Sequence, residues 1–231
     1  AALLDDEQYA LLGRAGARLL VVSGGAGSGK TTVALHRLAF MSHREPKRYR
    51  LKRMLVLVFG RALARYIDSV LPALGVHGVP VQTLGDWAHN LRYRHFPQLT
   101  RRLAEHTPAA VVRFKTHRIL LPMLAEAVAE RPETAPAQLF DDLFTDADWM
   151  RQGVARHAPG AFSESELTQI HRWCTDQQFR RSDEDEDEDF PPCYDEEDSM
   201  VLLRLHQLCT GRLRYSHRRG LSYDHQVIDE V

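Results

Sequence analysis

Residues 24 to 31 read Gly24-Gly25-Ala26-Gly27-Ser28-Gly29-Lys30-Thr31. This stretch matches G-x-x-x-x-G-K-[ST], a pattern whose glycines let the backbone curl until successive N–H groups point at phosphate oxygens. Lys30 brings a positive charge to the same phosphates, and the Thr31 hydroxyl is placed to ligate Mg²⁺. A helix that begins here adds the positive end of its dipole. The stretch therefore predicts a binding site for the phosphates of a nucleoside triphosphate.

The residues on either side of this loop suit the same interpretation. Residues 18–22, Arg-Leu-Leu-Val-Val, form a short apolar run that predicts a buried strand. Residues 32–41 have the spacing of a helix with an apolar face. Strand, glycine loop and helix in this order are the context that the motif requires, which disfavours a chance match.

A second signal lies at the far end of the chain. Residues 223–230 predict an apolar strand that ends in Asp229 and Glu230. In phosphate-loop enzymes such a strand is expected beside the first one, with its first acid on Mg²⁺ and its second polarising the attacking water. Alone, the pattern is more often a strand end with solvated acids, but together with the glycine loop it is a stronger signal.

The composition is that of a globular protein. The 231 residues allow one large domain or a core with an insertion. A net charge of −1 excludes a uniformly basic surface for nucleic acid but leaves local patches open. No apolar run approaches the ~20 residues of a membrane helix, and the N-terminus lacks the basic start of a signal peptide. The three cysteines have neither zinc nor disulfide spacing, so we expect a cytoplasmic protein with reduced thiols.

The order of the predicted elements indicates an α/β fold with a parallel sheet. Strands are expected at 54–59 and 79–83, with a helix at 61–74 between them. Beyond residue 87 the alternation stops, and helical spacing dominates, for example at 109–130 and 165–178, before a last helix at 200–208. We therefore predict a core made of residues 1–87 and 216–231, interrupted by a mostly helical insertion at 88–215.

Two charged stretches leave alternatives open. Residues 44–53 contain six Lys or Arg side chains, which suits either contact with a nucleic-acid backbone or a solvated loop. Residues 183–189 are seven consecutive acids, and further acids follow up to residue 198. Self-repulsion favours a solvated or disordered acidic loop at 183–198. The alternative is contact with a basic partner or mimicry of nucleic-acid phosphate.

With both nucleotide motifs placed, the chain resembles the N-terminal part of the UvrD/Rep-type superfamily 1 helicases, and more particularly their HelD-like branch. The similarity rests on residues 24–37, on the segment 55–75, on Gln82-Thr83-Leu84 with Trp87, and on Val227-Ile228-Asp229-Glu230. It covers residues 88–198 poorly. The resemblance implies a RecA-like P-loop NTPase domain, with the parallel sheet and the helical insertion described above.

The resemblance also implies roles for particular residues. Gln8 falls where the family has an adenine-reading glutamine, although its spacing alone favours a solvated residue. Lys30 and Glu230 are the implied catalytic residues, and Thr31 and Asp229 the implied Mg²⁺ ligands. The implied ATP-binding residues are Gln8, Gly24, Gly25, Ala26, Gly27, Ser28, Gly29, Lys30, Thr31 and Thr32.

Two departures from the family pattern affect what we expect of this chain. Gly60 stands where the helicases usually carry an asparagine, and the second nucleotide motif stops after Glu230. We therefore expect a fragment that binds ATP–Mg²⁺ weakly and hydrolyses it negligibly.

In the full-length protein, the resemblance implies ATP-driven movement along single-stranded DNA. The alternative is a HelD-like factor that binds and remodels RNA polymerase with the ATP site as a switch. A small-molecule kinase is disfavoured, because the Asp-Glu strand comes far later in the chain, across the helical insertion.

Overall fold

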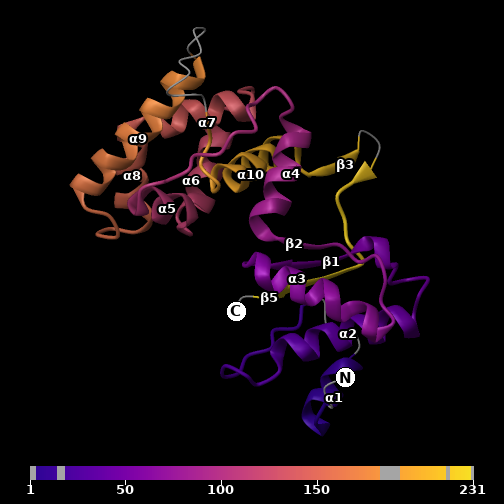
Figure 1. Cartoon of the computed structure of the whole chain (residues 1–231). Coiled ribbons are helices and arrows are strands. Elements are labelled where there is room, and N and C mark those ends of the chain that lie inside the picture. The colour runs from indigo at the N-terminus through magenta and orange to yellow at the C-terminus, as the bar shows by residue number, and fades with distance from the viewer. Residues whose placement is uncertain (1–3, 15–18, 183–192, 217–218, 230–231) are drawn as a thin grey trace. The chain divides into compact units, whose positions relative to one another are not determined.

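The computed structural model of the chain describes residues 4–14, 19–182, 193–216 and 219–229. It divides into two compact units, which we call the sheet unit (residues 1–87 and 222–231) and the helical unit (residues 88–221). The second boundary falls after residue 221, whereas the sequence placed it after residue 215. Both units can be followed by colour in Figure 1.

The sheet unit is built on a parallel sheet with the strand order β2-β1-β5. The strands are β1 (Met54–Val58), β2 (Val81–Thr83) and β5 (His225–Asp229). All five residues of β1 are buried, and Val56 pairs with Val81 on one side and with Val227 on the other. A continuous apolar run of this kind is typical of a parallel strand covered on both faces. The prediction of an α/β fold with a parallel sheet is confirmed.

The helical elements of the sheet unit are α1 (Asp6–Leu12), α2 (Lys30–Arg44), the short 3-10 turn η1 (Leu51–Arg53), α3 (Arg61–Val70), the 3-10 turn η2 (Leu71–Leu74) and the start of α4 (Leu84–His95). Of these, α3 and η2 connect β1 to β2 and return the chain to the amino ends of the strands. The predicted helix 61–74 is therefore an α-helix as far as Val70 and a 3-10 turn over Leu71–Leu74. Pro72 lies in this turn, where its missing N–H and its ring are tolerated better than in an α-helix interior.

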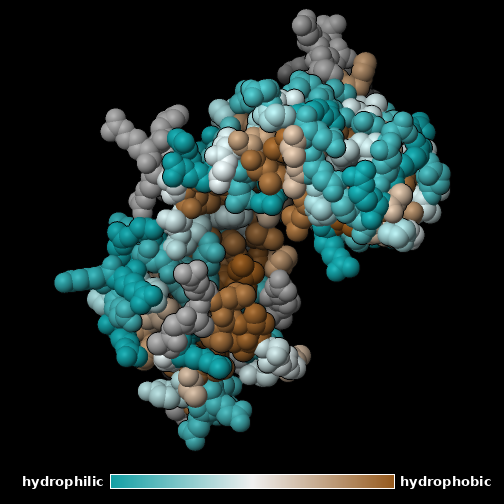
Figure 2. Space-filling view, turned by 180° about the vertical axis from the view of Figure 1, so that it is seen from behind, coloured by the Kyte–Doolittle hydropathy of each residue, from teal (hydrophilic) through white to brown (hydrophobic). Residues whose placement is uncertain are grey.

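The prediction of a buried strand at residues 18–22 is wrong. Residues 19–22 form no strand, and the side chains of Leu19 and Val21 are 80% and 78% exposed. The Asp-Glu strand, β5, pairs with β1 instead. A strand requires a neighbour that supplies ladder hydrogen bonds, and apolar composition does not reveal whether one is present. Ile228 on β5 is also 59% exposed. Figure 2 shows a hydrophobic patch on the surface of the sheet unit.

The helical unit contains most of the remaining chain. Its elements are the rest of α4, α5 (Ala109–Thr116), α6 (Leu120–Glu130), α7 (Pro136–Phe144), α8 (Ala147–His157), α9 (Glu164–Ser182), α10 (Asp198–Thr210) and an antiparallel pair, β3 (Arg214–Ser216) and β4 (Arg219–Gly220). The predicted helical stretch 109–130 is two helices, because His117 adopts extended backbone angles between them. The strand pair was not predicted. Edge-to-face contacts of Phe114 with Phe144 and Phe162 form part of the apolar core.

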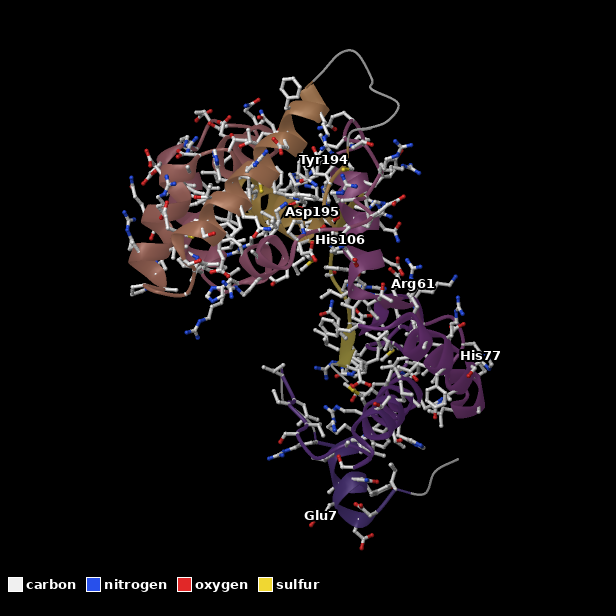
Figure 3. All side chains as sticks on the ribbon, turned by 60° about the vertical axis from the view of Figure 1, so that its left-hand side comes forward. Glu7, Arg61, His77, His106, Tyr194 and Asp195 are labelled. Carbon is white, nitrogen blue, oxygen red and sulfur yellow. The ribbon has the colours of Figure 1, made fainter. Side chains whose placement is uncertain are left out.

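A lysine and two aspartates are buried together inside the helical unit. Lys115 Nζ on α5 lies 2.6 Å from Asp195 Oδ2 and 2.6 Å from Asp198 Oδ1, and none of the three side chains is more than 1% exposed. Figure 3 shows Asp195 among the surrounding helices. Both aspartates were expected in a solvated acidic loop, and for them that expectation is wrong, because α10 begins at Asp198. The acidic run 183–189 lies outside the described residues.

Neutral donors complete the environment of Asp195. Its carboxylate accepts hydrogen bonds from the Thr107 hydroxyl (2.8 Å), the Gln177 amide (2.9 Å) and the Trp173 indole (3.1 Å). Burial alone would raise the pKa of Asp195, but the charge of Lys115 and these hydrogen bonds hold that pKa below its ordinary value. The Asp195 carboxylate is therefore kept in its charged form inside the protein.

We predict that Lys115→Met lowers the free energy of unfolding by about 3–5 kcal/mol, because it leaves two buried carboxylates without their cation. The matched control is Arg131→Met. The Arg131 side chain is 37% exposed and lies 3.5 Å from Asp142, so its loss should cost no more than about 1 kcal/mol. Urea unfolding followed by tryptophan fluorescence measures both values. Equal losses in the two variants would contradict the prediction.

Candidate functional site

The glycine loop and the start of α2 form a concave backbone surface at one end of the sheet. Gly27 and Gly29 have φ angles of 75° and 78°, a left-handed region that glycine adopts without strain, and Ser28 N donates to Gly25 O at 3.2 Å. Gly29 is the N-cap of α2, and among the described residues no side chain caps this helix end. The first-turn N–H groups and the helix dipole are thus available to an anion.

The side chain of Lys30 folds back over the loop. Its Nζ donates to the carbonyl oxygens of Gly24 and Gly25, each at 2.9 Å. The ammonium group therefore lies above the same concave surface as the first-turn N–H groups. An ammonium group has three N–H donors, so at least one remains for a phosphate oxygen.

A threonine and an aspartate from opposite ends of the sequence meet beside the loop. Thr31 Oγ1 donates to Asp229 Oδ2 at 2.6 Å, across 198 residues of chain. Thr31 lies in the first turn of α2, and Asp229 ends β5 opposite Val58, the last residue of β1. Because the strands are parallel, their carboxyl ends share one edge, and that edge is next to the loop.

These two oxygen atoms suit Mg²⁺, which takes one or two protein ligands and completes its shell with phosphate oxygens and water. Within the described residues there is no cluster of three or more histidine, cysteine or acidic side chains able to hold a metal ion without such help. Two protein oxygen atoms are a donor set that fits a metal ion arriving with a nucleotide. Glu230, the implied water-activating residue, lies outside the described residues.

Gln8, on α1, also contacts the glycine loop. In the first turn of α1 its backbone N–H donates to Asp5 Oδ1 at 2.8 Å, and its Oε1 accepts from Asp5 N at 3.2 Å. This reciprocal pair caps the helix. The Gln8 amide nitrogen also donates to Ser28 O at 3.2 Å. Gln8 thus contacts the backbone of the phosphate loop.

Arg37, which the sequence did not single out, holds α1 in this position. It is only 7% exposed, and its guanidinium donates to Leu11 O (2.7 Å), Leu12 O (2.9 Å) and Arg14 O (3.1 Å). Carbonyls at a helix end lack helical partners, so this cation satisfies them and ties α1 to α2. The only signal in the sequence is an arginine within the apolar spacing of the helix after the loop.

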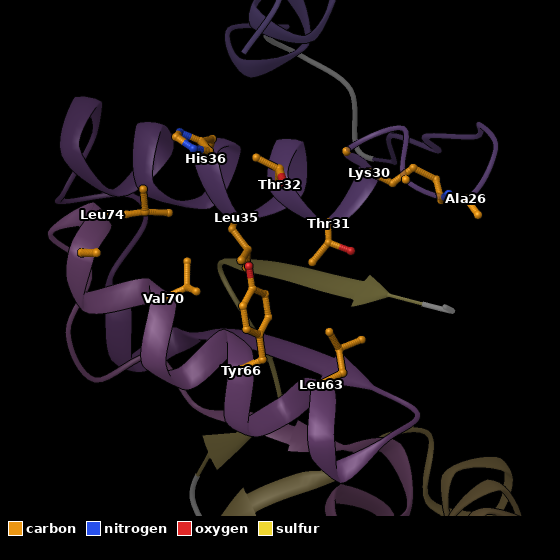
Figure 4. Close-up of a pocket in the computed structure, with 13 residues that line it drawn as sticks. Ala26, Lys30, Thr31, Thr32, Leu35, His36, Leu63, Tyr66, Val70 and Leu74 are labelled. Atoms are coloured by element: carbon orange, nitrogen blue, oxygen red, sulfur yellow. The ribbon is translucent and has the colours of Figure 1, made fainter. Parts of the chain in front are cut away.

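A groove of about 400 Å³ opens beside the loop (Figure 4). Loop and α2 residues line one side, and Leu63, Tyr66 and Val70 of α3 line the other. Tyr66 is 59% exposed, and its ring points toward α2. The sequence predicted the helix at 61–74 but not that part of α3 remains open beside the loop.

A glycine loop that enters a helix, next to a threonine–aspartate pair at the carboxyl ends of a parallel sheet, defines a domain of the P-loop NTPase type. Such a domain binds a nucleotide together with a metal ion. A family model described as "AAA domain" matches residues 7–231, so the chain belongs to the AAA domain family.

P-loop NTPase-like domains of this family are found in UvrD/Rep-like helicases. The match therefore supports a protein of the superfamily 1 helicase class. The family match also places the protein broadly among the nucleotide hydrolases. A search among curated proteins found no match. None of the described helices is long and apolar enough to cross a membrane.

We predict that Gly29→Ala removes nucleotide binding and destabilises the loop. Residue 29 has a φ of 78°, and an added Cβ would lie 3.0 Å from the Gln8 amide nitrogen. Gly60→Ala is the matched control, because Gly60 lies outside the loop, has a φ of −117° and would give a Cβ that meets nothing within 4 Å. Titration with a fluorescent ATP analogue compares the two variants. Normal binding by Gly29→Ala, or equal loss in both, would contradict the prediction.

Proposed function

We propose that this chain is the ATP-binding domain of a superfamily 1 DNA helicase or translocase, which couples ATP hydrolysis to movement on single-stranded DNA in the full-length protein. The observation that carries the proposal is the contact between Thr31 and Asp229 beside the uncapped start of α2. In this proposal the start of α2 would hold the phosphates and the Thr31–Asp229 pair would hold the metal ion, at the same edge of the sheet. Membership of the AAA domain family supports the same class.

In this proposal the loop and Lys30 hold the nucleotide phosphates. Lys30, whose ammonium group has one N–H beyond the two that bond Gly24 O and Gly25 O, would move to donate to the β- and γ-phosphate oxygens. The first-turn N–H groups of α2 donate to the same phosphates. Because these donors are already arranged in the loop, little reorganisation is needed beyond the movement of Lys30.

Thr31 and Asp229 would hold the metal ion, once their direct hydrogen bond opens. When bound, Mg²⁺ neutralises part of the phosphate charge that develops during transfer. Glu230 would accept a proton from the attacking water, which is the usual task of a carboxylate at that position. Gln8 would read the adenine edge, because an amide both donates and accepts hydrogen bonds.

We predict that Lys30→Ala abolishes saturable binding of a fluorescent ATP analogue, because the loop loses its only formal positive charge. Thr31→Val and Asp229→Asn should instead weaken the dependence of binding on Mg²⁺. Thr32→Val is the matched control, since Thr32 is the neighbouring threonine on α2 and no metal role is proposed for it. Unchanged binding by Lys30→Ala in a folded chain would refute the nucleotide site.

A second experiment separates movement on DNA from the alternative role, in which a HelD-like factor binds and remodels RNA polymerase. We predict that the full-length protein binds single-stranded DNA with a steep salt dependence, as a protein that follows the phosphate backbone does. Filter binding over a range of salt concentrations measures it. Capture of RNA polymerase in a pull-down, lost when residues 183–189 are deleted, would favour the alternative.

A further inference from the structure

The end of the sheet unit opposite the nucleotide site carries a concentration of positive charge. The segment that joins α2 to β1 contains Arg44, Lys47, Arg48, Arg50, Lys52 and Arg53, which we call the basic face. Because β1, β2 and β5 are parallel, this segment lies at their amino ends, whereas the glycine loop lies at their carboxyl ends. Two residues labelled in Figure 3 mark these ends. Arg61 begins α3, after the carboxyl end of β1, and His77 follows η2, before the amino end of β2.

Two acids partly neutralise the basic face. Glu45 pairs with Arg48 at 3.4 Å, and Asp224, just before β5, pairs with Arg50 at 3.3 Å and Arg53 at 3.2 Å. Six cations against two anions leave a net charge of +4, in a chain whose overall net charge is −1. In Figure 2 the left-hand side of the sheet unit, where this segment lies, is covered by hydrophilic residues.

The ion pairs hold the backbone of this segment in place, and they leave other cations exposed. Asp224 also accepts from Arg50 N at 3.3 Å, and Arg53 Nη2 donates to the Ser222 hydroxyl at 2.8 Å, so the segment is held against the chain that enters β5. Among the described residues, Arg44, Lys47 and Lys52 form no ion pair, and all three are exposed.

The surroundings of these cations favour phosphate over other partners. Tyr49, the aromatic residue of the segment, is half-buried, lies under the Arg48 guanidinium at 5.1 Å and meets the edge of His225. It therefore offers no free ring on which a single-stranded base could stack. The segment also presents no exposed aromatic anchor of the kind that dominates protein interfaces. Exposed point charges without such anchors suit a regular phosphate backbone.

We propose that the basic face binds the phosphate backbone of double-stranded nucleic acid, independently of base sequence. This surface is additional to the nucleotide site and lies at the opposite end of the sheet. Duplex binding should therefore proceed without ATP, and changes on the basic face should leave ATP binding intact.

The test measures binding of a short labelled DNA duplex to the whole chain by fluorescence anisotropy over a range of salt concentrations. The charge-reversal variant is Lys47→Glu/Lys52→Glu. The matched control is Arg118→Glu/Arg172→Glu, which alters net charge equally at two exposed arginines of the helical unit. We expect the first variant to bind at least about tenfold more weakly, with a log–log salt slope reduced by about 2, and the control to bind almost normally.

Three results would overturn the proposal. They are no duplex binding by the unmodified chain, equal losses of duplex binding in both charge-reversal variants, and a loss of single-stranded DNA binding in Lys47→Glu/Lys52→Glu as large as its loss of duplex binding. The fluorescent ATP analogue is titrated in parallel, and both charge-reversal variants should bind it normally. Loss of duplex binding alone therefore bears on the basic face, whereas loss of analogue binding in Lys30→Ala bears on the nucleotide site.

Discussion

The two parallel ladders of β1 determine where the rest of the sheet unit lies. β1 is buried along its whole length and pairs with β2 on one side and β5 on the other, so the carboxyl ends of all three strands reach one edge. The contact between Thr31 and Asp229 exists only in this register. A slip of β5 by a single residue would turn Asp229 to the other face of the sheet and away from α2.

The helical unit is organised by a different interaction. Its core is apolar, and the hydrophobic effect that drives its burial has no direction of its own. The Lys115 ammonium between Asp195 and Asp198 is directional, and it connects α5 to the start of α10. We interpret this buried group as a constraint on helix register more than as a net source of stability, because desolvation offsets much of the attraction between buried charges.

The sequence was sufficient for features encoded by neighbouring residues. Glycine spacing predicted the loop, a continuous apolar run predicted β1, and an apolar run ending in acids predicted β5. It failed where the outcome depends on distant partners. Residues 19–22 are apolar but pair with none of the three strands, and Asp195 looked solvated because its partner Lys115 lies far away in the chain. The structure brings most predicted site residues to one edge, while their roles stay predictions.

The buried guanidinium of Arg37 makes the beginning of the chain part of the core. Its three acceptors are the Leu11, Leu12 and Arg14 carbonyls, at the end of α1 and just beyond it. A protein trimmed past residue 14 would retain the cation and lose all three acceptors, at about 1–3 kcal/mol for each N–H donor that water does not reach. The same cut would remove Gln8 from the loop. Proteolysis near the N-terminus should therefore unfold the sheet unit instead of shortening it harmlessly.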